Sequence, residues 1–244
     1  MLTLLTPTGC RPLAWAQCER LMARQDYAEP VRWIIVDDGE PAQPVTFSRP
    51  GWQVQILRPR PPWRSGQNTQ ARNMLAALDA AGTGPIAIIE DDDYYAPTWL
   101  SRVSNELAQA DLVGQTRMRY YHVGHRCWYQ HENRSHASLC ATAVKGPAVT
   151  ALRACCKPTV RYFDLMLWRS YRGVKRLFDS SEVLGTKGLP GRAGICGGHR
   201  LESFRGYIHD PEGQQLSAWL GEDSAFYLGL GTAKIPCATR ANMR

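Results

Sequence analysis

Long apolar runs are missing from this 244-residue sequence, and so is a secretory leader. No stretch approaches the roughly 18 apolar residues that a membrane span requires. The opening MLTLLTPTGCRP has neither a basic n-region nor a long apolar segment. Internal repeats and low-complexity tracts are also missing. We therefore expect a cytoplasmic protein that does not insert stably into a membrane.

Cysteine pairs of the C-x-x-C type are missing as well, although the chain has eight cysteines. Zinc sites and redox motifs typically use such pairs, and disulfides accompany secretion. We therefore expect reduced, mostly buried thiols.

Charge of one sign is in excess. The chain has 29 Lys and Arg against 22 Asp and Glu, a formal net charge of +7 and a pI near 9.1. Such a balance favours polyanionic partners, either nucleic acid or an anionic membrane surface. The hydrophobic content of 44% with 21% charged residues is typical of a globular protein with a full core.

The first third of the chain alternates short apolar runs with amphipathic segments, which predicts an α/β fold with a mostly parallel sheet. The expected strands are residues 2–6, 32–39, 52–57 and 85–89. One helix is expected to begin at Pro12 and another at Pro97. A third is expected over residues 68–82, with Thr69 as its cap and Gly82 at its end.

The pattern changes after residue 110. Residues 111–144 show β-type alternation with many aromatic side chains. Helices are expected at residues 147–157 and 161–178. Residues 185–200, GTKGLPGRAGICGGHR, are expected to form a loop because they contain six glycines.

Carboxylates follow two of the predicted strands. Asp37 and Asp38 come at the end of the second, and the run Glu90–Asp93 follows the fourth without a spacer. Open parallel α/β sheets bind ligands at the carboxyl ends of their strands. Adjacent carboxylates repel one another, so the run predicts a positive charge among them. A solvated turn is the alternative, and it suits Asp37 and Asp38 better than the run.

Five segments, taken in order, resemble the motifs of a family 2-like glycosyltransferase with the GT-A fold: LLTPTGCRP, WIIVDDG, NTQARNMLAALDAAG, IIEDDDYYAPTWL and WLGEDSAFYLGL. The resemblance covers residues 2–110 and returns near 221–230. It implies a Rossmann-like, mostly parallel sheet flanked by helices, with a smaller acceptor-side part of strands, loops and C-terminal helices. A single catalytic domain, 1–244, would bind the nucleotide sugar through residues 1–110 and the acceptor through residues 111–244.

The resemblance also implies roles for individual residues. The acid-x-acid element that holds a divalent metal on the donor diphosphate matches Glu90 and Asp92, with Asp93 beside them. The catalytic base of inverting members matches Asp223, with Glu222 as the alternative. The residues implied around the donor nucleotide are Thr6, Pro7, Thr8, Asp37, Asp38, Arg72 and Asp91.

Residue chemistry agrees with this assignment. Transfer of a sugar leaves a charged nucleoside diphosphate behind, and Mn²⁺ or Mg²⁺ held by oxygen ligands stabilises that charge better than zinc would. Inverting transfer also needs a base to take the proton of the acceptor hydroxyl. We therefore expect a nucleotide-sugar donor, with a UDP-sugar as the first choice, and a divalent cation.

Two histidines are further candidates for the expected site. His199 and His209 flank the glycine-rich segment, and each is a candidate for the metal or the diphosphate. Four basic residues, Lys187, Arg192, Arg200 and Arg205, are candidates to cover the leaving diphosphate or to contact an anionic acceptor, with solvated loop charges as the alternative. The His-rich segment 122–136 matches no trusted zinc spacing and is interpreted as an acceptor-side surface.

The acceptor is inferred from charge and size. The +7 balance and the basic amphipathic stretch WRSYRGVKRLF suit a DNA backbone or a membrane surface. The chain also resembles small phage-encoded transferases that glycosylate hydroxymethylpyrimidines in DNA, which would place it in the host cytoplasm and make DNA its partner, with the target base flipped out of the helix.

Three other readings stay open at this point. One is a transferase for a surface glycan or a lipid-linked sugar, and another is a non-catalytic basic module that binds nucleic acid. The third is a sugar-nucleotide nucleotidyltransferase, for which TPTGCRP is a poor phosphate loop because it lacks lysine and has only one glycine.

Overall fold

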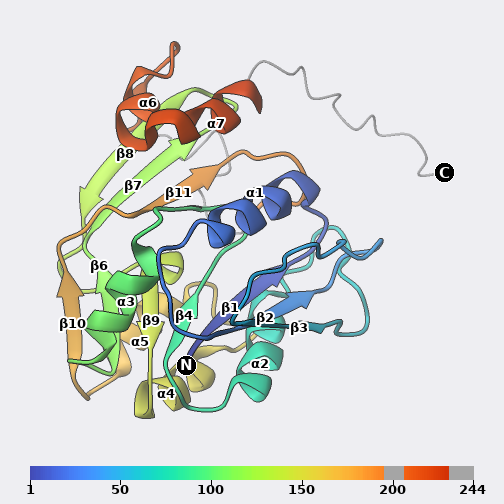
Figure 1. The fold of residues 1–244 in the computed structure, drawn as a ribbon, viewed down its shortest axis with the longest axis vertical. Helices are drawn as coiled ribbons and strands as arrows, with labels where there is room; N and C mark the ends of the chain where they lie inside the picture. The colour runs from blue at the N-terminus through green and yellow to red at the C-terminus, as the bar shows by residue number, and fades with distance from the viewer. Residues whose placement is uncertain (195–205, 231–244) are drawn as a thin grey trace.

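The computed structural model describes residues 1–194 and 206–230, which contain two sheets (Figure 1). The first sheet has seven strands in the order β10-β6-β9-β4-β1-β2-β3. Every neighbouring pair is parallel except the two that involve β9. The strands are β1 (Leu2–Thr8), β2 (Val31–Asp37), β3 (Trp52–Leu57), β4 (Ile86–Ile88), β6 (Leu112–Gln115), β9 (Thr142–Val144) and β10 (Lys175–Phe178). This arrangement confirms the expected mostly parallel α/β sheet.

Helices cover both faces of this sheet, and its central strands are therefore buried on both sides. Leu4, Trp33 and Ile35 belong to one apolar core, whereas Leu5 and Ile34 belong to the other. The first core also contains side chains of α1 (Pro12–Ala23) and α3 (Trp99–Leu107). The second contains side chains of α2 (Gln70–Ala81), α4 (Pro147–Cys155) and α5 (Phe163–Ser170). The alternation along each strand therefore fixes which helices lie on which face.

A second sheet adjoins the first at the end where the acids lie. Its five strands run in the order β12-β8-β7-β11-β5. They are β5 (Tyr94–Tyr95), β7 (Arg117–His122), β8 (Cys127–Glu132), β11 (Val183–Lys187) and β12 (Ile208–His209). Next to β7 and β8 in Figure 1 lie α6 (Gln214–Leu220) and α7 (Ser224–Leu230). Because β5 follows Asp93 directly, this sheet fixes one end of the acidic run.

The expected helix over residues 161–178 is wrong in its second half. The helix α5 ends at Ser170, and residues 175–178 form β10, which pairs in parallel with β6. Val174 and Phe178 suited a helical face by their spacing, but Gly173 lies between the two segments and interrupts the helix. Residues 175–178 then form a strand because they pair with β6 at the edge of the sheet.

The expected loop over residues 185–200 is also partly wrong, because residues 185–187 complete β11. A Cβ atom at Gly185 would lie 2.6 Å from Cδ1 of Tyr120, so this glycine allows a close approach between β11 and β7. Residues 195–205, including His199, Arg200 and Arg205, lie outside the described residues.

The remaining boundaries agree with expectation to within two residues: β1 continues to Thr8, β2 ends at Asp37, and α3 begins at Trp99 and not at Pro97. Thr69 precedes α2 as expected, but its hydroxyl group donates to Asp38 and does not cap the helix. Among the described residues, no helix has the length and apolar character needed to cross a bilayer.

Candidate active site

The four acids after β4 lie at the carboxyl edge of the main sheet. Three of them form ion pairs with two basic side chains of the same chain. The Arg11 guanidinium lies 2.6 Å from Asp91 and 3.2 Å from Asp92. Lys187 at the end of β11 places its Nζ 3.9 Å from Asp93. The positive charge predicted from the sequence is therefore supplied in part by side chains of the chain itself.

The hydrogen bonds of Asp91 indicate a structural role. Its carboxylate accepts hydrogen bonds from the Thr8 hydroxyl group and from Arg11, both at 2.6 Å. Burial opposes the charge of Arg11, but Asp91 and Asp92 outweigh this effect and raise the pKa of Arg11. Asp91 therefore joins the first strand–helix turn to the acidic run, and it has little capacity left for a donor.

Asp93 is buried with one oxygen bonded and one free. Its Oδ1 accepts the Thr186 backbone N–H at 2.8 Å, whereas its Oδ2 is buried and receives no hydrogen bond from the described residues. Burial raises the pKa of Asp93 to about 6, Lys187 works in the opposite direction, and Asp92 adds to the increase. A buried, unsatisfied carboxylate oxygen in a cavity wall is a strong candidate for a metal ligand.

Glu90 lies close to Asp93 and to a residue that the sequence did not suggest. Ligand atoms of Glu90, Asp93 and Cys140 all lie within 4.8 Å of one another. Burial, followed by the charges of Asp93 and Asp92, raises the pKa of Glu90, and burial raises that of the Cys140 thiol. The Gln70 side-chain amide donates a hydrogen bond to the Glu90 carboxylate at 2.9 Å. The oxygen donors of Glu90 and Asp93 therefore fit a hard divalent cation, with Asp92 as a further ligand once it leaves Arg11.

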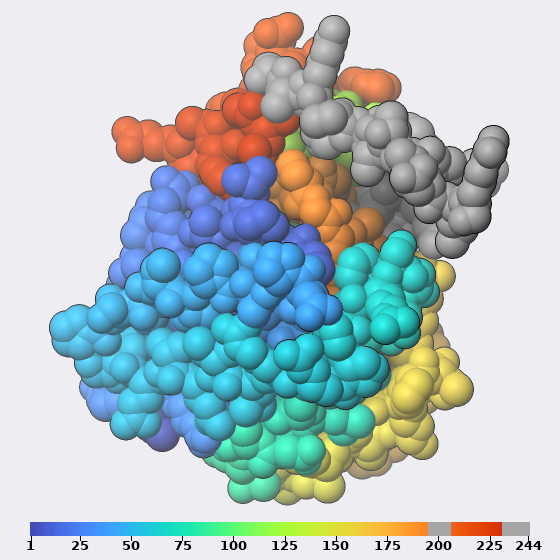
Figure 2. Space-filling model, turned by 90° about the vertical axis from the view of Figure 1, so that its right-hand side faces the viewer, coloured from blue at the N-terminus to red at the C-terminus, as the bar shows by residue number. Residues whose placement is uncertain are grey.

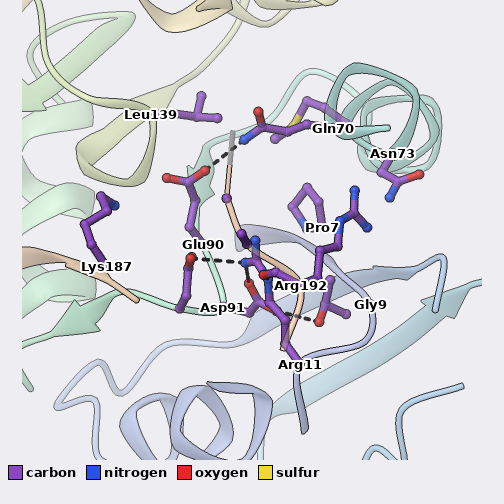
Figure 3. A pocket seen from close by; sticks show the side chains of 15 residues that line it. Pro7, Gly9, Arg11, Gln70, Asn73, Glu90, Asp91, Leu139, Lys187 and Arg192 are labelled. Carbon is purple, nitrogen blue, oxygen red and sulfur yellow. Dashed lines mark hydrogen bonds and ion pairs between the residues drawn. The ribbon is translucent and has the colours of Figure 1, made fainter. Parts of the chain in front are cut away.

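A cavity of about 110 Å³ lies over these acids (Figure 3). In Figure 3, Glu90 and Lys187 face it from one side, and Asn73 and Pro7 face it from the other. Of the residues expected around donor and metal, Pro7, Thr8, Glu90, Asp91 and Asp92 line it. The remaining lining residues include Gly9, Arg11, Gln70, Met74, Leu139, Arg192, Ala193 and Gly194.

Asp37 and Asp38, expected to hold the nucleotide base, are buried and do not line this cavity. Asp37 accepts the backbone N–H groups of Gly39 and Gln43 and lies 3.2 Å from Arg58. The Asp38 oxygens accept hydrogen bonds from the side chains of Thr69, Arg72 and Arg192. Both aspartates therefore already have a full set of hydrogen-bond donors.

Arg192 connects the segment after β11 to the first turn of the chain. Its guanidinium lies 2.7 Å from Asp38 and 4.7 Å from the centre of the Trp63 ring, and its backbone N–H donates to Cys10. Figure 2 shows this segment, in orange, lying between N-terminal residues in blue and the segment near residue 63 in cyan. A base that approaches Asp38 must therefore displace Arg192.

Arg72 and Thr6 support the site and do not line the cavity. Arg72 bridges Asp38, at 3.0 Å, and the Pro61 carbonyl, at 2.8 Å. Thr6 is fully buried, and its hydroxyl oxygen accepts the Trp33 indole N–H.

The expected base residues lie elsewhere. Asp223 is held by Arg20 of α1, by Arg24 just after that helix and by the Tyr94 hydroxyl group. Glu222 is exposed beside it, and neither residue lines the cavity over the acids or the second cavity next to it. The same is true of His209, which is exposed on β12. Among the described residues, Asp223 is connected to the acidic run only through Tyr94, which directly follows Asp93.

A second cavity, of about 310 Å³, adjoins the first. Four residues line both cavities: Gln70, Glu90, Leu139 and Lys187. The other walls of the second cavity come from residues 131–140, from the start of α5 with the two residues before it, and from Asp93 and Tyr120. The polar residues among them include His131, Asn133, His136 and Asp164. Sequence reasoning missed Cys140 and Asp164, because only the fold brings them to the acids.

The architecture and the site now agree with one family, whose sequence profile, described as glycosyl transferase family 2, matches residues 16–157. The chain belongs to this family. No curated protein matches the sequence of this glycosyltransferase.

Solved structures show the same fold at low identity. The mannosyltransferase PcManGT from Pyrobaculum calidifontis, in complex with GDP-Man and Mn²⁺, aligns over 100% of this chain and 76% of its own, with 14% identity and a TM-score of 0.55. Residues 1–349 of S. aureus TarS align over 76% of this chain with 12% identity and a TM-score of 0.55. The alignment covers 60% of that TarS structure and 36% of a longer one. The family 2 glycosyltransferase therefore has the GT-A fold.

Proposed function

We propose that this family 2 glycosyltransferase moves a sugar from a UDP-sugar to a hydroxymethylpyrimidine base in DNA, with Mn²⁺ or Mg²⁺ bound and with inversion at the transferred carbon. The observation that carries this proposal is the carboxylate run Glu90–Asp93 at the carboxyl edge of the sheet, in which Asp91 and Asp93 are buried and Glu90, Asp91 and Asp92 line the first cavity. Burial and mutual repulsion make that run unfavourable without a cation.

The donor side follows from the same geometry. A divalent cation held by Glu90, Asp92 and Asp93 would act as a Lewis acid on the donor diphosphate. The Arg11 and Lys187 cations line the same cavity and are in place to bind phosphate oxygens. Relatives in fold support this choice of ligands, since TarS has been solved with UDP-GlcNAc and PcManGT with GDP-Man and Mn²⁺.

DNA as the acceptor is supported by charge. The net charge is +7, and exposed basic side chains follow one another along α5 and β10: Arg161, Arg169, Arg172, Lys175 and Arg176. Arg161 also lines the second cavity, so a phosphate backbone bound along these residues would present a base or sugar to that cavity.

A membrane-bound acceptor is the second candidate, and one observation favours it. Tyr162, just before α5, and Met166, within it, are 45% and 46% exposed, and basic residues Arg161 and Arg169 lie near them in the chain. An apolar stripe bordered by basic residues also suits an anionic lipid surface. A transferase for a lipid-linked or surface glycan would use α5 in this way.

The test uses the whole protein with a panel of UDP- and GDP-sugars, Mn²⁺, and duplex DNA containing hydroxymethylcytosine or hydroxymethyluracil. After digestion to nucleosides, mass spectrometry should detect a base heavier by one sugar residue, and EDTA should abolish it. Unmodified DNA is the matched control. Slow Mn²⁺-dependent donor hydrolysis without any modified nucleoside would remove the DNA half and leave the transferase half, and liposomes carrying a lipid-linked acceptor would then test the second candidate.

A further inference from the structure

Cys140 is a buried cysteine that the proposed function leaves without a role. The short 3-10 turn η1 (Leu139–Ala141), which directly precedes β9, fixes its position. Cys140 lines the second cavity together with Glu90 and Asp93, and ligand atoms of these three residues all lie within 4.8 Å of one another. Because Glu90 lines the first cavity as well, this thiol–carboxylate cluster lies where the two cavities adjoin.

A buried cysteine usually acts as a small apolar side chain, and Cys140 does belong to the first apolar core. Cys18 belongs to the same core and is fully buried. Within the described residues, however, Cys140 is the only cysteine that joins two carboxylates in a group of metal-ligand atoms. Its surroundings therefore differ from those of an ordinary core cysteine.

The contacts of Asp93 leave one of its two oxygens open. The Thr186 backbone N–H donates to Oδ1 at 2.8 Å, and Nζ of Lys187 lies 3.9 Å from the same oxygen. Oδ2 is buried and accepts no hydrogen bond from the described residues, in a side chain that is only 1% exposed. Such an oxygen has lost its water without a replacement, which is unfavourable. A cation bound to Oδ2 would supply the missing partner.

The charges of the site also suit a divalent ion. The run Glu90–Asp93 contributes four carboxylates, and two basic side chains, Arg11 and Lys187, pair with three of them. When all four carboxylates are ionised, these groups together keep two negative charges in excess. One divalent cation would balance them and relieve the repulsion between neighbouring acids.

We propose that Cys140 is a ligand of the divalent cation at this site, together with Glu90 and Asp93, and that its sulfur makes the site select a thiophilic ion over Mg²⁺. The inference rests on the proposed function for the use of the ion, whereas ion binding itself is measured without transfer. The thiol gives its proton to water as the ion binds, because the thiolate is the form that ligates metals.

The ligand set decides which ion is preferred. Mg²⁺ requires oxygen ligands in octahedral geometry, whereas a thiolate favours softer ions such as Zn²⁺. The affinity for a mixed sulfur and oxygen set is expected to rise from Mn²⁺ through Co²⁺ to Zn²⁺. Of the two ions in the proposed function, Cys140 therefore favours Mn²⁺.

The test titrates Co²⁺ alone into the whole, metal-free protein and records its absorption. A thiolate bound to Co²⁺ gives an intense charge-transfer band in the near ultraviolet, which carboxylates do not give. The band should appear in wild type, disappear on addition of Zn²⁺ and persist in an excess of Mg²⁺. It should be absent in Cys140→Ser. Cys156→Ser is the matched control and should keep the band, because Cys156 is equally buried, at 2% exposed, and lines neither cavity.

The expected loss of affinity is large. Cys140→Ser should weaken Co²⁺ binding by more than the ~10–100-fold that loss of a hydrogen-bond partner outside the ligand shell costs. Its Mg²⁺ affinity should stay within about twofold of wild type, since the carboxylates are unchanged. Melting temperatures of the metal-free variants control for folding. If Cys140→Ser does not fold, X-ray absorption of wild type with equimolar Zn²⁺ decides: one sulfur at ~2.3 Å beside oxygens supports the inference, and oxygens and nitrogens alone overturn it.

Failure of this inference and failure of the proposed function give different results. If folded Cys140→Ser keeps the band, or Mg²⁺ displaces Co²⁺ as readily as Zn²⁺ does, the inference is overturned whatever the transferase activity. If wild type transfers a sugar with Mn²⁺ but gives no band with Co²⁺, the function stands and the inference is overturned. If the band depends on Cys140 while wild type neither hydrolyses nor transfers any nucleotide sugar with Mn²⁺, the metal ligand stands and the proposed function fails.

Discussion

Neighbouring acids in the run Glu90–Asp93 have different tasks, and the difference lies in their partners. Asp91 is bonded by Thr8 and Arg11, whereas Asp92 touches the same Arg11 from a more exposed position. Removal of one partner of a buried ion pair leaves the other charge uncompensated, which costs about 3–5 kcal/mol. Removal of a partly exposed carboxylate from a shared cation costs far less, because Asp91 still holds Arg11.

We therefore expect Asp91→Ala to lower the free energy of unfolding by about 3–5 kcal/mol, measured by urea denaturation. Asp92→Asn should change it by less than about 0.5 kcal/mol and should instead abolish Mn²⁺-dependent donor binding in calorimetry. Equal stability losses in the two variants would contradict this division of tasks, as would an unchanged donor affinity in Asp92→Asn.

Lys187 is the second residue whose position predicts a measurable effect. It borders both cavities, lies 3.9 Å from Asp93 and is within 5.5 Å of the Tyr120 ring centre. A cation placed between donor and acceptor stabilises negative charge on the departing diphosphate more than in the bound donor. Lys187→Met should therefore reduce kcat by about 10²–10³-fold with a small change in donor Kd, and Lys187→Arg should retain part of the rate. A change confined to donor Kd would reduce Lys187 to a binding residue.

At the scale of elements, the sequence predicts well where its periodicity is unambiguous. The strand β3 has the expected bounds, and α1 begins at Pro12 as expected, because a strong pattern and a clear boundary coincide there. The run after Gly173 was mistaken for helix because its few apolar residues fit both periods. Only pairing with β6 distinguishes them, and that pairing joins residues about 60 positions apart in the chain.

The candidate site follows the same rule. The sequence identifies the acidic run, since four adjacent carboxylates are visible by eye. It does not show that Arg11 binds Asp91 or that Lys187 reaches Asp93, because these contacts join distant segments. Asp164 was hidden for the same reason: it looks like one acid in an amphipathic helix until the fold places residues 131–140 across from it.

The end of β7 contains a titratable group that links stability to pH. His122 packs against Gly188, and its ring centre is 4.4 Å from that of His125. Burial lowers the pKa of His122 to about 4, with smaller contributions from the charges of His125 and Lys187. The unfolded chain, with a pKa near 6.5, therefore binds more protons than the folded chain between pH 4 and 6.5.

The contribution of His122 to stability should consequently be lost as the pH falls from 6.5 toward 4, whereas the raised pKa values of Asp93 and Glu90 act in the opposite direction. The change in calorimetric melting temperature per pH unit across this window should therefore be less positive in His122→Gln than in wild type. His209→Gln is the matched control because that imidazole is exposed, and its slope should equal that of wild type. An equal slope in all three proteins would assign the pH dependence to other groups.

For the molecule as a whole, the excess of basic residues is unevenly distributed. Asp91 and Asp93 are buried at the sheet edge, whereas exposed basic residues follow one another from Arg161 through α5 to β10, and Arg161 lines the second cavity. Under the proposed function, a polyanionic acceptor would meet this basic surface next to that cavity. A polyanion bound there gains affinity from counterion release, and that affinity falls steeply with salt.

Two variants with the same net charge distinguish DNA binding at one local basic surface from attraction by the net charge of the whole protein. Arg169→Gln with Arg172→Gln, and Arg60→Gln with Arg64→Gln, each remove two exposed arginines and lower the formal charge from +7 to +5. For duplex DNA, the first pair should reduce the slope of log K against log salt by about 1 per residue that contacts phosphate, and the second pair should leave it at the wild-type value. Equal effects would mean that DNA responds only to net charge. A different result would assign α5 to a lipid surface: wild type binds anionic liposomes but not DNA, and the first pair of substitutions abolishes the liposome binding. The same arginines can bind either polyanion, so only the measured partner distinguishes the two.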